Sequence, residues 1–303
     1  MKTTMNLKEI KQFGNVELLA RQMVEGFITG LHKSPYHGFS VEFAEHRLYN
    51  SGESTRYIDW KVFARTDKLF VKRFEEETNL RCHLVLDNSS SMYYPQKDLA
   101  KIRFSTLAAA AIAYMLQKQR DAVGLTTFAE GIEQQTQVKS TPAHLNSIFR
   151  IMNNLLEQES AKKRTNTADT LHLLAEQIHK RSLVVIFSDM MDNFSEQDAL
   201  FSALQHLKHN KHEILLFHVT DKATEQLFDF EDRPYHFIDL ETGTEVKVNP
   251  ANIRGYYQEQ VTKQFSALKL KCGQYKIDFI EADVAQSFDQ ILLPYFIKRS
   301  RMH

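Results

Sequence analysis

The sequence predicts an α/β protein with a mostly parallel central sheet and helices on both faces. From residue 80 onward, short apolar runs alternate with amphipathic stretches, which is the pattern of repeated β–α–β units. The stretch Leu183 to Phe187 reads LVVIF, a continuous apolar run typical of parallel strands buried on both faces. Two of these runs end in oxygen-bearing residues, at Asp87 and at Ser188-Asp189. Ligands of such sheets bind beyond the carboxyl ends of the strands, so a site is expected at this edge.

The composition of the chain excludes several classes of protein. The chain has 303 residues, of which 43% are hydrophobic and 25% are charged, as in ordinary globular proteins. Lys plus Arg equals Asp plus Glu at 38 each, so no bulk charge favours nucleic acid or an anionic membrane. The sequence shows no signal-peptide core and no run of the roughly 18 apolar residues that a membrane helix needs. Cys82 and Cys272 lack metal-ligand spacing, so we expect a reduced, cytoplasmic protein.

Residues 1–79 are expected to form an extension packed on the main domain. Apolar residues at gaps of three and four trace one helical face over residues 6–32. After a break at Pro35, residues 38–78 are dense in charge but also hold aromatic residues, among them Trp60. A disordered charged tail would lack such residues, so we expect ordered short strands and loops.

Four basic residues of this segment admit two interpretations. In the first, they pair with acidic neighbours in an ion network, because the two charge signs are nearly balanced here. In the second, some of them stay free to bind a phosphate or an acidic partner. These residues are Arg47, Arg56, Arg65 and Lys72.

The main domain is expected to run from residue 80 to residue 303. Strands are predicted at 80–86, 122–128, 132–138, 183–187, 214–219 and 276–280, and helices at 97–119, 141–157, 170–180, 195–208, 250–271 and 287–298. The helix at 97–119 has an alanine-rich side suited to close packing on a sheet. A hairpin is predicted at 235–240 and 245–248, turned at Thr242-Gly243.

The principal candidate site is the turn that follows the first strand of this domain. The strand ends at Asp87, and Ser89, Ser90 and Ser91 follow. A carboxylate and several hydroxyls on a tight turn suit a small hard cation, because such ions take oxygen ligands. Asp and Ser are also favoured turn and N-cap residues, so a purely structural turn is the alternative.

No catalytic residue is predicted. The sequence has no glycine-rich phosphate loop, no G-x-G-x-x-G fingerprint, no G-x-S-x-G elbow and no cysteine pair for zinc. Asp87 is disfavoured as an aspartyl-phosphate nucleophile, because Ser89 stands where a second acidic residue is needed.

Two sets of residues carry a resemblance to known families. The first set begins with the run D-x-S-x-S, which is formed by Asp87, Ser89 and Ser91. With Thr167 and the strand end Ser188-Asp189, it resembles the metal-ion-dependent adhesion site of a von Willebrand factor A domain. The second set, over residues 42–65, reads E-F-x-x-x-R-x-Y-x-x-G-E-x-x-R-x-I-D-W-K-x-x-A-R and resembles the bacterial family called domain of unknown function 58.

The resemblance implies a Rossmann-like A domain with Mg²⁺ at the rim, and Mn²⁺ or Ca²⁺ as alternative ions. The hydroxyls of Ser89 and Ser91 would bind the ion directly. Thr167 would bind it directly or through water, and Asp87 and Asp189 would act mostly through hydrogen bonds and water. A carboxylate from a partner would then be a good further ligand, because hydroxyl ligands leave the ion underneutralised.

Two departures from the family pattern concern the loops. Met190 stands where A domains usually have a glycine, and Thr165-Asn166 stand where related proteins often have glycines. Thr167 is therefore the least secure ligand. Asp192 is a candidate for an outer contact to the ion or for an acidic rim, with a helix cap as the alternative.

The expected function is a non-enzymatic, divalent-metal-dependent protein-interaction module. Because members of the family are commonly linked with MoxR-type AAA+ ATPases, the resemblance implies an adaptor or co-chaperone of such an ATPase. The expected location is cytoplasmic, with attachment to the inner membrane through partners as the alternative. Two other functions stay open: binding of phosphate or nucleic acid through the Arg-rich 47–73 segment, and metal-assisted hydrolysis.

Overall fold

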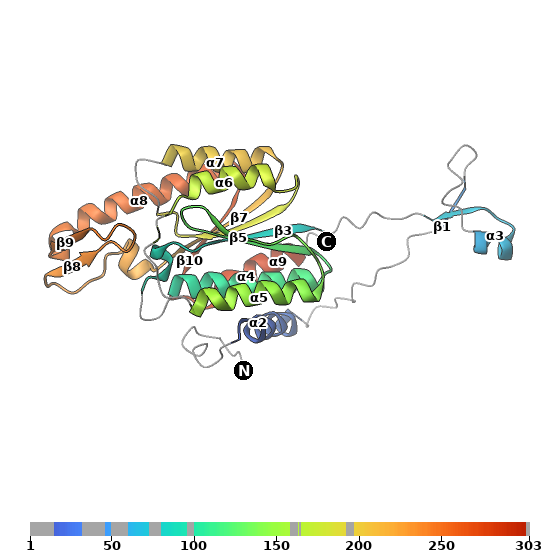
Figure 1. Ribbon diagram of the computed structural model, residues 1–303, viewed down its shortest axis with the longest axis horizontal. Coiled ribbons are helices and arrows are strands. Elements are labelled where there is room, and N and C mark those ends of the chain that lie inside the picture. Colours follow the sequence, from blue (N-terminus) through green and yellow to red (C-terminus); the bar gives the residue numbers. More distant parts are fainter. Residues whose placement is uncertain are drawn as a thin grey trace. The chain divides into compact units, whose positions relative to one another are not determined.

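The computed structural model describes residues 15–31, 46–49, 60–72, 80–95, 100–157, 163, 165–191 and 197–300 (Figure 1). They belong to two compact units. The first combines Met1–Leu31 with Leu80–His303, and the second is His32–Asn79. The helix at the start of the chain therefore belongs to the same unit as the main domain.

The first unit is built on a six-stranded sheet in the order β10-β7-β6-β3-β4-β5. The strands are β3 Arg81–Asp87, β4 Ala122–Phe128, β5 Ile132–Gln135, β6 Leu183–Ser188, β7 Glu213–Thr220 and β10 Asp278–Asp283. All neighbours are parallel except β4 and β5, which are antiparallel. Numbered along the chain, this is the doubly wound order 3-2-1-4-5-6, so the predicted mostly parallel α/β fold is confirmed.

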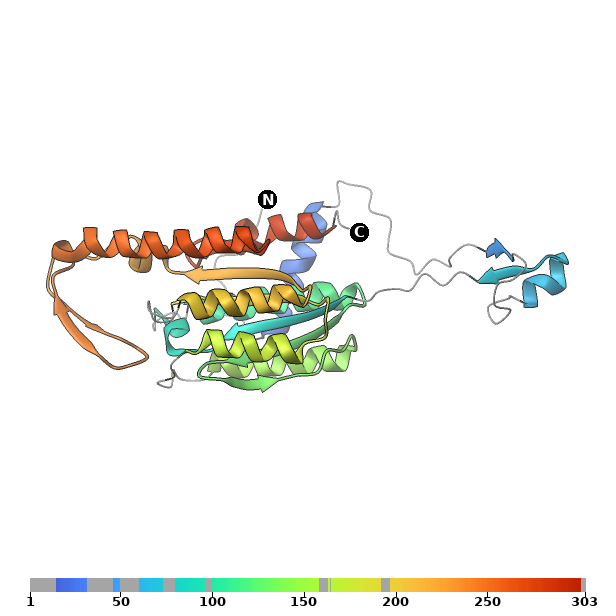
Figure 2. The same cartoon turned by 90° about the horizontal axis from the view of Figure 1, so that it is seen from above.

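Helices cover both faces of the sheet (Figures 1 and 2). They are α2 Val16–Leu31, α4 Ala100–Lys118, α5 Pro142–Glu157, α6 Thr167–Gln177, α7 Gln197–His209, α8 Pro250–Gln274 and α9 Phe288–Ser300. Side chains of α2, α4, α5 and α9 share one hydrophobic core with the sheet, and those of α6, α7 and α8 share the other. None of the helices in the described part of the chain combines the length and apolarity needed to span a membrane.

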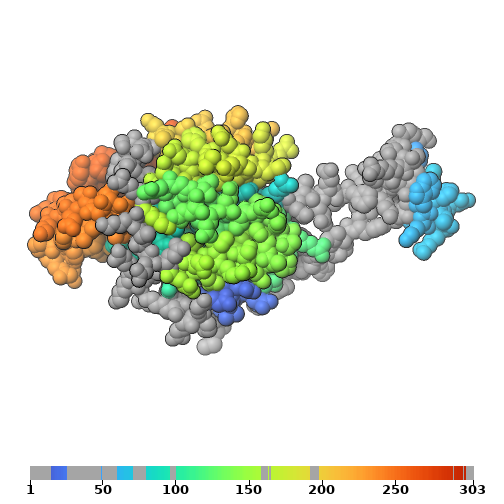
Figure 3. Space-filling model, viewed as in Figure 1, coloured from blue at the N-terminus to red at the C-terminus, as the bar shows by residue number. Residues whose placement is uncertain are grey.

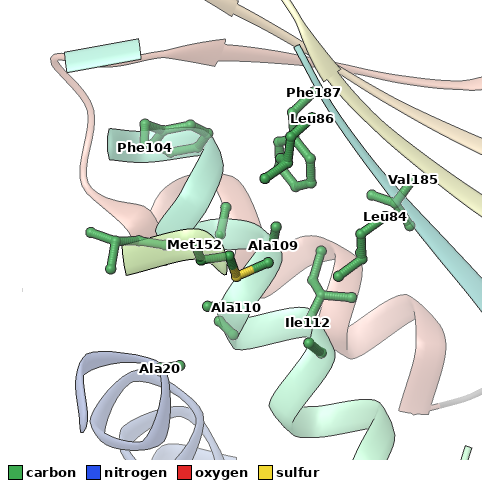
Figure 4. Close-up of a cluster of buried hydrophobic side chains, with 14 of the residues drawn as sticks. Ala20, Leu84, Leu86, Phe104, Ala109, Ala110, Ile112, Met152, Val185 and Phe187 are labelled. Carbon is green, nitrogen blue, oxygen red and sulfur yellow. The ribbon is translucent and has the colours of Figure 1, made fainter. Parts of the chain in front are cut away.

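Helix α4 is buried on nearly all sides because alanines let its neighbours approach closely (Figure 4). Leu84 of β3 and Phe187 of β6 point toward it from the sheet, and Ala20 of α2 lies on its other side. Ala109 and Ala110 of α4 are fully buried between them. Such a central helix buries much apolar surface, which is the dominant favourable contribution to folding.

Helices α2 and α6 begin at other residues than predicted. Among the described residues α2 begins at Val16, after Asn15, whose side-chain oxygen accepts hydrogen bonds from the backbone N–H groups of Glu17 and Leu18. That is the role of an N-cap residue. Residues 6–14 of the predicted helix lie outside the described part. Helix α6 begins at Thr167, before the predicted residue 170.

The second unit contains two short antiparallel strands, β1 His46–Leu48 and β2 Phe70–Lys72. Short strands were expected here, but the structure also has a helix, α3 Trp60–Thr66, where loops were predicted. Trp60 and Phe63 contact each other edge to face, with ring centroids 6.1 Å apart. Their spacing of three residues places both rings on one helical face, a pattern that the dense charge around them obscured.

A separate two-stranded hairpin projects from the first unit. Its strands are β8 Tyr235–Ile238 and β9 Glu245–Val248, and they pair only with each other. It follows the short helix η3 Lys222–Gln226 and precedes α8. The aromatic rings of Phe228, Phe237 and Tyr257 pack at its base. The predicted hairpin is therefore present, with β8 two residues shorter than expected.

Candidate metal-binding site

Asp87 is the last residue of β3 and is fully buried. One carboxylate oxygen, Oδ1, accepts a hydrogen bond from the backbone N–H of Ser89 at 2.9 Å. The other, Oδ2, accepts one from the hydroxyl of Ser188, at the end of the neighbouring strand β6, at 2.7 Å. Because β3 and β6 are parallel neighbours, their carboxyl ends meet and hold this carboxylate from two sides.

The serine turn comprises Ser89, Ser90 and Ser91, at the start of a short 3-10 helix, η2 Ser90–Tyr93. The hydroxyl oxygens of Ser89 and Ser91 are 3.0 Å apart. The hydroxyl of Ser89 also contacts Asp87, and that of Ser91 contacts Asp189. Four predicted metal-site residues, two serines and two aspartates, are thus joined in one network.

Asp189 follows β6 and is paired with a buried lysine of α4. The Nζ of Lys101 lies 2.8 Å from Oδ2 of Asp189 and 2.5 Å from Oε1 of Glu225, which belongs to η3. Lys101 is fully buried, and Asp189 is 1% exposed. We call these three residues the buried ion triad. It connects α4, the end of β6 and the loop after β7.

The carboxylates of the site lie in an environment that disfavours further negative charge. Burial, together with the charge of Asp189, raises the pKa of Asp87 to about 8. Burial alone would also raise the pKa of Asp189, but the charge of Lys101 and its hydrogen bond outweigh burial and lower it. For Lys101, the two carboxylates outweigh the effect of burial and raise the pKa. Asp189 and Lys101 are therefore ionised, while burial raises the pKa of Glu225 although the charge of Lys101 opposes the increase. Among the described residues, no cation is paired with Asp87.

A second layer of hydrogen bonds fixes the serine turn. The side chain of Asn88 donates to Glu133 at 2.6 Å and accepts from the hydroxyl of Tyr93 at 2.6 Å. Lys163 forms an ion pair with Glu133 at 2.6 Å. Its backbone N–H donates to the hydroxyl of Ser90 at 2.8 Å, and its carbonyl oxygen accepts from the N–H of Ser90. The turn therefore keeps its shape through contacts to β5 and to the loop before α6.

Thr167 is the first residue of α6 and is fully buried. The residue before it, Asn166, caps the helix by accepting a hydrogen bond from the N–H of Asp169. The N–H of Asn166 donates to the carbonyl of Ala129, just beyond the end of β4. Thr167 thus lies at the same edge of the sheet as the serine turn, and its role as a ligand stays a prediction.

Met190 has a backbone φ of 49°, in the left-handed region that favours glycine. The structure explains how a methionine is held there. Its N–H donates to the hydroxyl of Ser188 at 2.9 Å, and its side chain is 9% exposed within the core shared with α6 and α7. Backbone strain of about 1 kcal/mol per residue is usual for such a conformation.

The other predicted residues are not brought to this site by any described contact. Arg65 is exposed at the end of α3 in the second unit. Asp192 and Arg56 lie outside the described residues, as do the side chains of Arg47 and Lys72. The ion-network interpretation and the phosphate interpretation of the basic residues therefore stay predictions.

Sequence reasoning missed Lys101 and Glu225. A signal for Lys101 was present, because it is a cation on a helix whose other faces read as alanine and apolar residues. Glu225 gave no such signal, since it lies in a polar stretch after a strand.

The donors that meet at this edge are oxygens only, from two carboxylates and two hydroxyls. Elsewhere in the described ranges no group of three or more His, Cys, Asp or Glu side chains is placed to hold a metal ion. An all-oxygen set that includes neutral hydroxyls suits a hard divalent cation and disfavours a soft transition metal.

The chain is similar to several known proteins in sequence or in structure. Mb1516 of Mycobacterium bovis and Rv1480 of Mycobacterium tuberculosis, both described as uncharacterized proteins, are each 26% identical over 238 residues, which span 78% of this chain and 73% of theirs. Among solved structures, BatB of Bacteroides thetaiotaomicron is similar at 11% identity and a TM-score of 0.42, over 74% of this chain and 98% of BatB.

A second similar structure is proximal thread matrix protein 1 from the mussel byssus, whose description mentions a zinc-occupied MIDAS motif. It matches at 12% identity and a TM-score of 0.35, over 46% of this chain and 38% of that protein. A family model matches residues 45–267, which is most of the chain. That family is described as protein of unknown function DUF58, and the chain belongs to it.

Proposed function

We propose that this protein is a non-enzymatic, divalent-metal-dependent protein-interaction module that acts as an adaptor or co-chaperone for a MoxR-type AAA+ ATPase. One observation carries the proposal. The hydroxyls of Ser89 and Ser91, 3.0 Å apart, converge with two buried carboxylates at the carboxyl edge of the sheet. Mg²⁺ is the ion that such oxygen donors suit, with Mn²⁺ and Ca²⁺ as alternatives.

The charges of the site fit a divalent cation. The ammonium of Lys101 is paired with Asp189 and Glu225, and the third carboxylate, of Asp87, lies within electrostatic reach of Asp189. If all three carboxylates were ionised, two negative charges would lack a partner. Ser89 and Ser91 would hold the ion directly, with Asp87, Asp189 and Thr167 supporting it. The bound ion would supply the positive charge that recognises an acidic side chain of a partner.

Two nitrogen bases near the serine turn, Lys101 and His218, are poorly arranged for hydrolysis. A serine nucleophile needs a neighbouring base. Lys101 has a raised pKa and is held by two carboxylates, so it keeps its proton. The Nε2 of His218 is hydrogen-bonded to the carbonyl oxygen of Asp189 at 2.9 Å and therefore carries a proton itself. These arrangements favour recognition over catalysis.

The partner class follows from the family rather than from the site. An adaptor needs an exposed docking surface, and the serine turn lies at the end of the sheet, where Ser91 is partly exposed. An acidic residue on the ATPase or on its client would complete the ion's ligands.

The test is retention of partners from cell extract, with Mg²⁺ or with a chelator. We compare the wild type with Ser89→Ala/Ser91→Ala, and use Ser202→Ala, on the exposed side of α7, as the matched control. The double variant and the chelator should each release the same partners, and the control should release none. An unchanged partner set under both treatments would refute the metal requirement.

A purified MoxR-type ATPase tests the partner separately. It should bind the immobilised wild type in Mg²⁺ and not the double variant. If the ATPase does not bind while other proteins are still retained in an Mg²⁺-dependent way, the metal-dependent module stands and the ATPase assignment fails.

A further inference from the structure

The β8–β9 hairpin touches the candidate site through its tip. Glu241, in the turn between the strands, accepts two hydrogen bonds from Thr165, from the backbone N–H at 3.2 Å and from the hydroxyl at 2.8 Å. Thr165 lies two residues before Thr167. The same loop is hydrogen-bonded to the serine turn, through Lys163 and Ser90. A carboxylate of the chain's own hairpin therefore lies at the rim of the site.

The turn that carries Glu241 has a fixed shape. The carboxylate of Asp239 accepts hydrogen bonds from the N–H of Glu241 at 2.8 Å and from the hydroxyl of Thr242 at 2.7 Å. Gly243 closes the turn with a φ of 73°, which glycine adopts without strain. The acidic side chain is thus presented by a preorganised turn, so little conformational freedom is lost when it binds.

The hairpin lies on the surface of the first unit, within the orange part of the space-filling view (Figure 3), and hydrogen bonds anchor it at its base. At the base, the guanidinium of Arg254 donates to the carbonyl oxygens of Phe228 and Phe230, at 3.2 Å and 2.7 Å. Along the strands, Ile238 and Val246 are each 54% exposed. The tip can therefore leave Thr165 without disturbing the core of the unit.

Glu241 is also within electrostatic reach of the site. Burial raises its pKa, and the charge of Asp189 contributes to the increase, although the hydrogen bonds from Thr165 oppose it. A divalent cation at the rim would attract Glu241 and so offset the repulsion from Asp189. The hairpin tip is thus placed as an acidic ligand of the site would be.

We propose that Glu241 is an internal competitor for the docking site, and that an acidic side chain of the partner displaces the hairpin tip when it binds. The inference rests on the proposed function. The ligand class is a protein segment that presents Asp or Glu on a turn, as the hairpin itself does. Because the tip is tethered, it competes at an effective concentration on the order of millimolar, and weak acidic ligands are rejected.

The test uses the full chain and a fluorescently labelled synthetic peptide of residues 235–248, which contains the hairpin tip. In Mg²⁺ the peptide should bind the Glu241→Gln protein about tenfold more tightly than the wild type, because the internal tip no longer competes. Glu245→Gln is the matched control, since it makes the same charge change on the same hairpin at a residue paired with His236. The Glu245→Gln protein should bind the peptide with the same affinity as the wild type. A peptide that itself carries Glu241→Gln should bind none of the proteins.

Equal binding of the peptide to the wild type and to Glu241→Gln, or binding to neither, would overturn the inference. Hydrogen exchange gives a second measure that needs no ligand. The backbone amide of Thr165 should exchange faster in Glu241→Gln than in Glu245→Gln, and equal rates would also count against the inference. Binding of Mg²⁺ is measured separately, by calorimetry on the wild type and on Ser89→Ala/Ser91→Ala. A gain in peptide binding that persists in chelator would support the competition and reject the metal requirement.

Discussion

The two ends of the central sheet bury titratable groups in different ways. At the carboxyl ends of the strands, Lys101 is enclosed as an ion between Asp189 and Glu225. At the amino ends, His83 of β3 and His212, just before β7, are 8% and 1% exposed, and burial lowers the pKa of each. The carboxyl end therefore holds buried ions beside the neutral imidazole of His218, whose pKa burial lowers to about 4, whereas the two buried imidazoles of the amino end have no buried ion triad beside them in the described part of the chain.

The difference shows what each end does. Burying an ion is costly unless partners compensate for the lost hydration, so a charged cluster needs a purpose or a precise set of partners. The neutral imidazole of His212 is a core residue that accepts a hydrogen bond from the N–H of Ser182. Charge at the carboxyl end thus favours ligand binding there, and the amino end is structural.

The largest change in stability is expected when the buried ammonium of Lys101 is removed. Lys101→Met should lower the free energy of unfolding by about 3 to 5 kcal/mol, because it leaves two carboxylates buried without a counter-charge. Chemical denaturation in chelator measures the loss. Lys118→Met, at the exposed end of the same helix, is the matched control and should change stability by about 0.5 kcal/mol or less. A loss as small as the control's would show that the triad is not a set of mutually compensating ions.

Acid should destabilise the protein in part through His83, at the opposite end of the sheet. Burial, with the charges of His212 and Arg81, lowers the pKa of His83 to about 4, against 6.5 in an unfolded chain. The folded state therefore resists protonation. The stability that His83 contributes is complete above pH 6.5 and falls as the pH approaches 4, by up to about 3 kcal/mol.

Denaturation at several pH values between 4 and 7 checks this prediction. His83→Leu cannot take up a proton, so its stability should depend less on pH over this window than that of the wild type. His179→Leu, at an exposed position after α6, should keep the slope of the wild type. Parallel slopes for all three proteins would mean that His83 does not contribute to the acid response.

Divalent cations should stabilise the protein by binding at the carboxyl ends of the strands only. Saturating Mg²⁺ should stabilise the wild type by about 1 to 3 kcal/mol, since an ion that binds only the folded state adds its binding free energy. The increase should vanish in Ser89→Ala/Ser91→Ala and persist in His83→Leu. Thermal melts with Mg²⁺ or chelator give the result. A melting temperature of the wild type that does not respond to Mg²⁺ would contradict the metal proposal.

The fold could be predicted from local patterns because the central strands β3, β6 and β7 are largely apolar and end in polar residues. The run ending at Asp87 and the run LVVIF became the neighbours β3 and β6, as parallel alternation required. The start of α6 was predicted too late, although Asn166 stands three residues before Asp169, the spacing of a helix cap. Helix α3 was missed because charged residues surround its two aromatic rings.

The site could be predicted from the sequence only in part, because several of its residues meet through contacts between distant parts of the chain. Asp87, Ser89 and Ser91 lie within one turn, and the sheet topology adds Asp189. Contacts between residues that are distant in sequence leave no periodic signal. Glu241 meets Thr165 across 76 positions, and Lys101 meets Asp189 across 88. A pattern that treats lysine and glutamate as surface residues cannot anticipate either contact.

The smallest change in stability is expected at the amino end of the sheet. There we ask whether a hydrogen bond stabilises the structure, as ions do at the carboxyl end. Asp121, which is 7% exposed, accepts a hydrogen bond at 2.9 Å from the N–H of Leu80, just before β3. Asp121→Ala removes that acceptor and should cost about 1 kcal/mol, the usual size of one hydrogen bond. Asp121→Asn keeps an acceptor oxygen without the charge and should recover most of the loss in denaturation experiments. If Asp121→Asn were as unstable as Asp121→Ala, the charge itself would be needed at this end, and the contrast between the two ends of the sheet would fail.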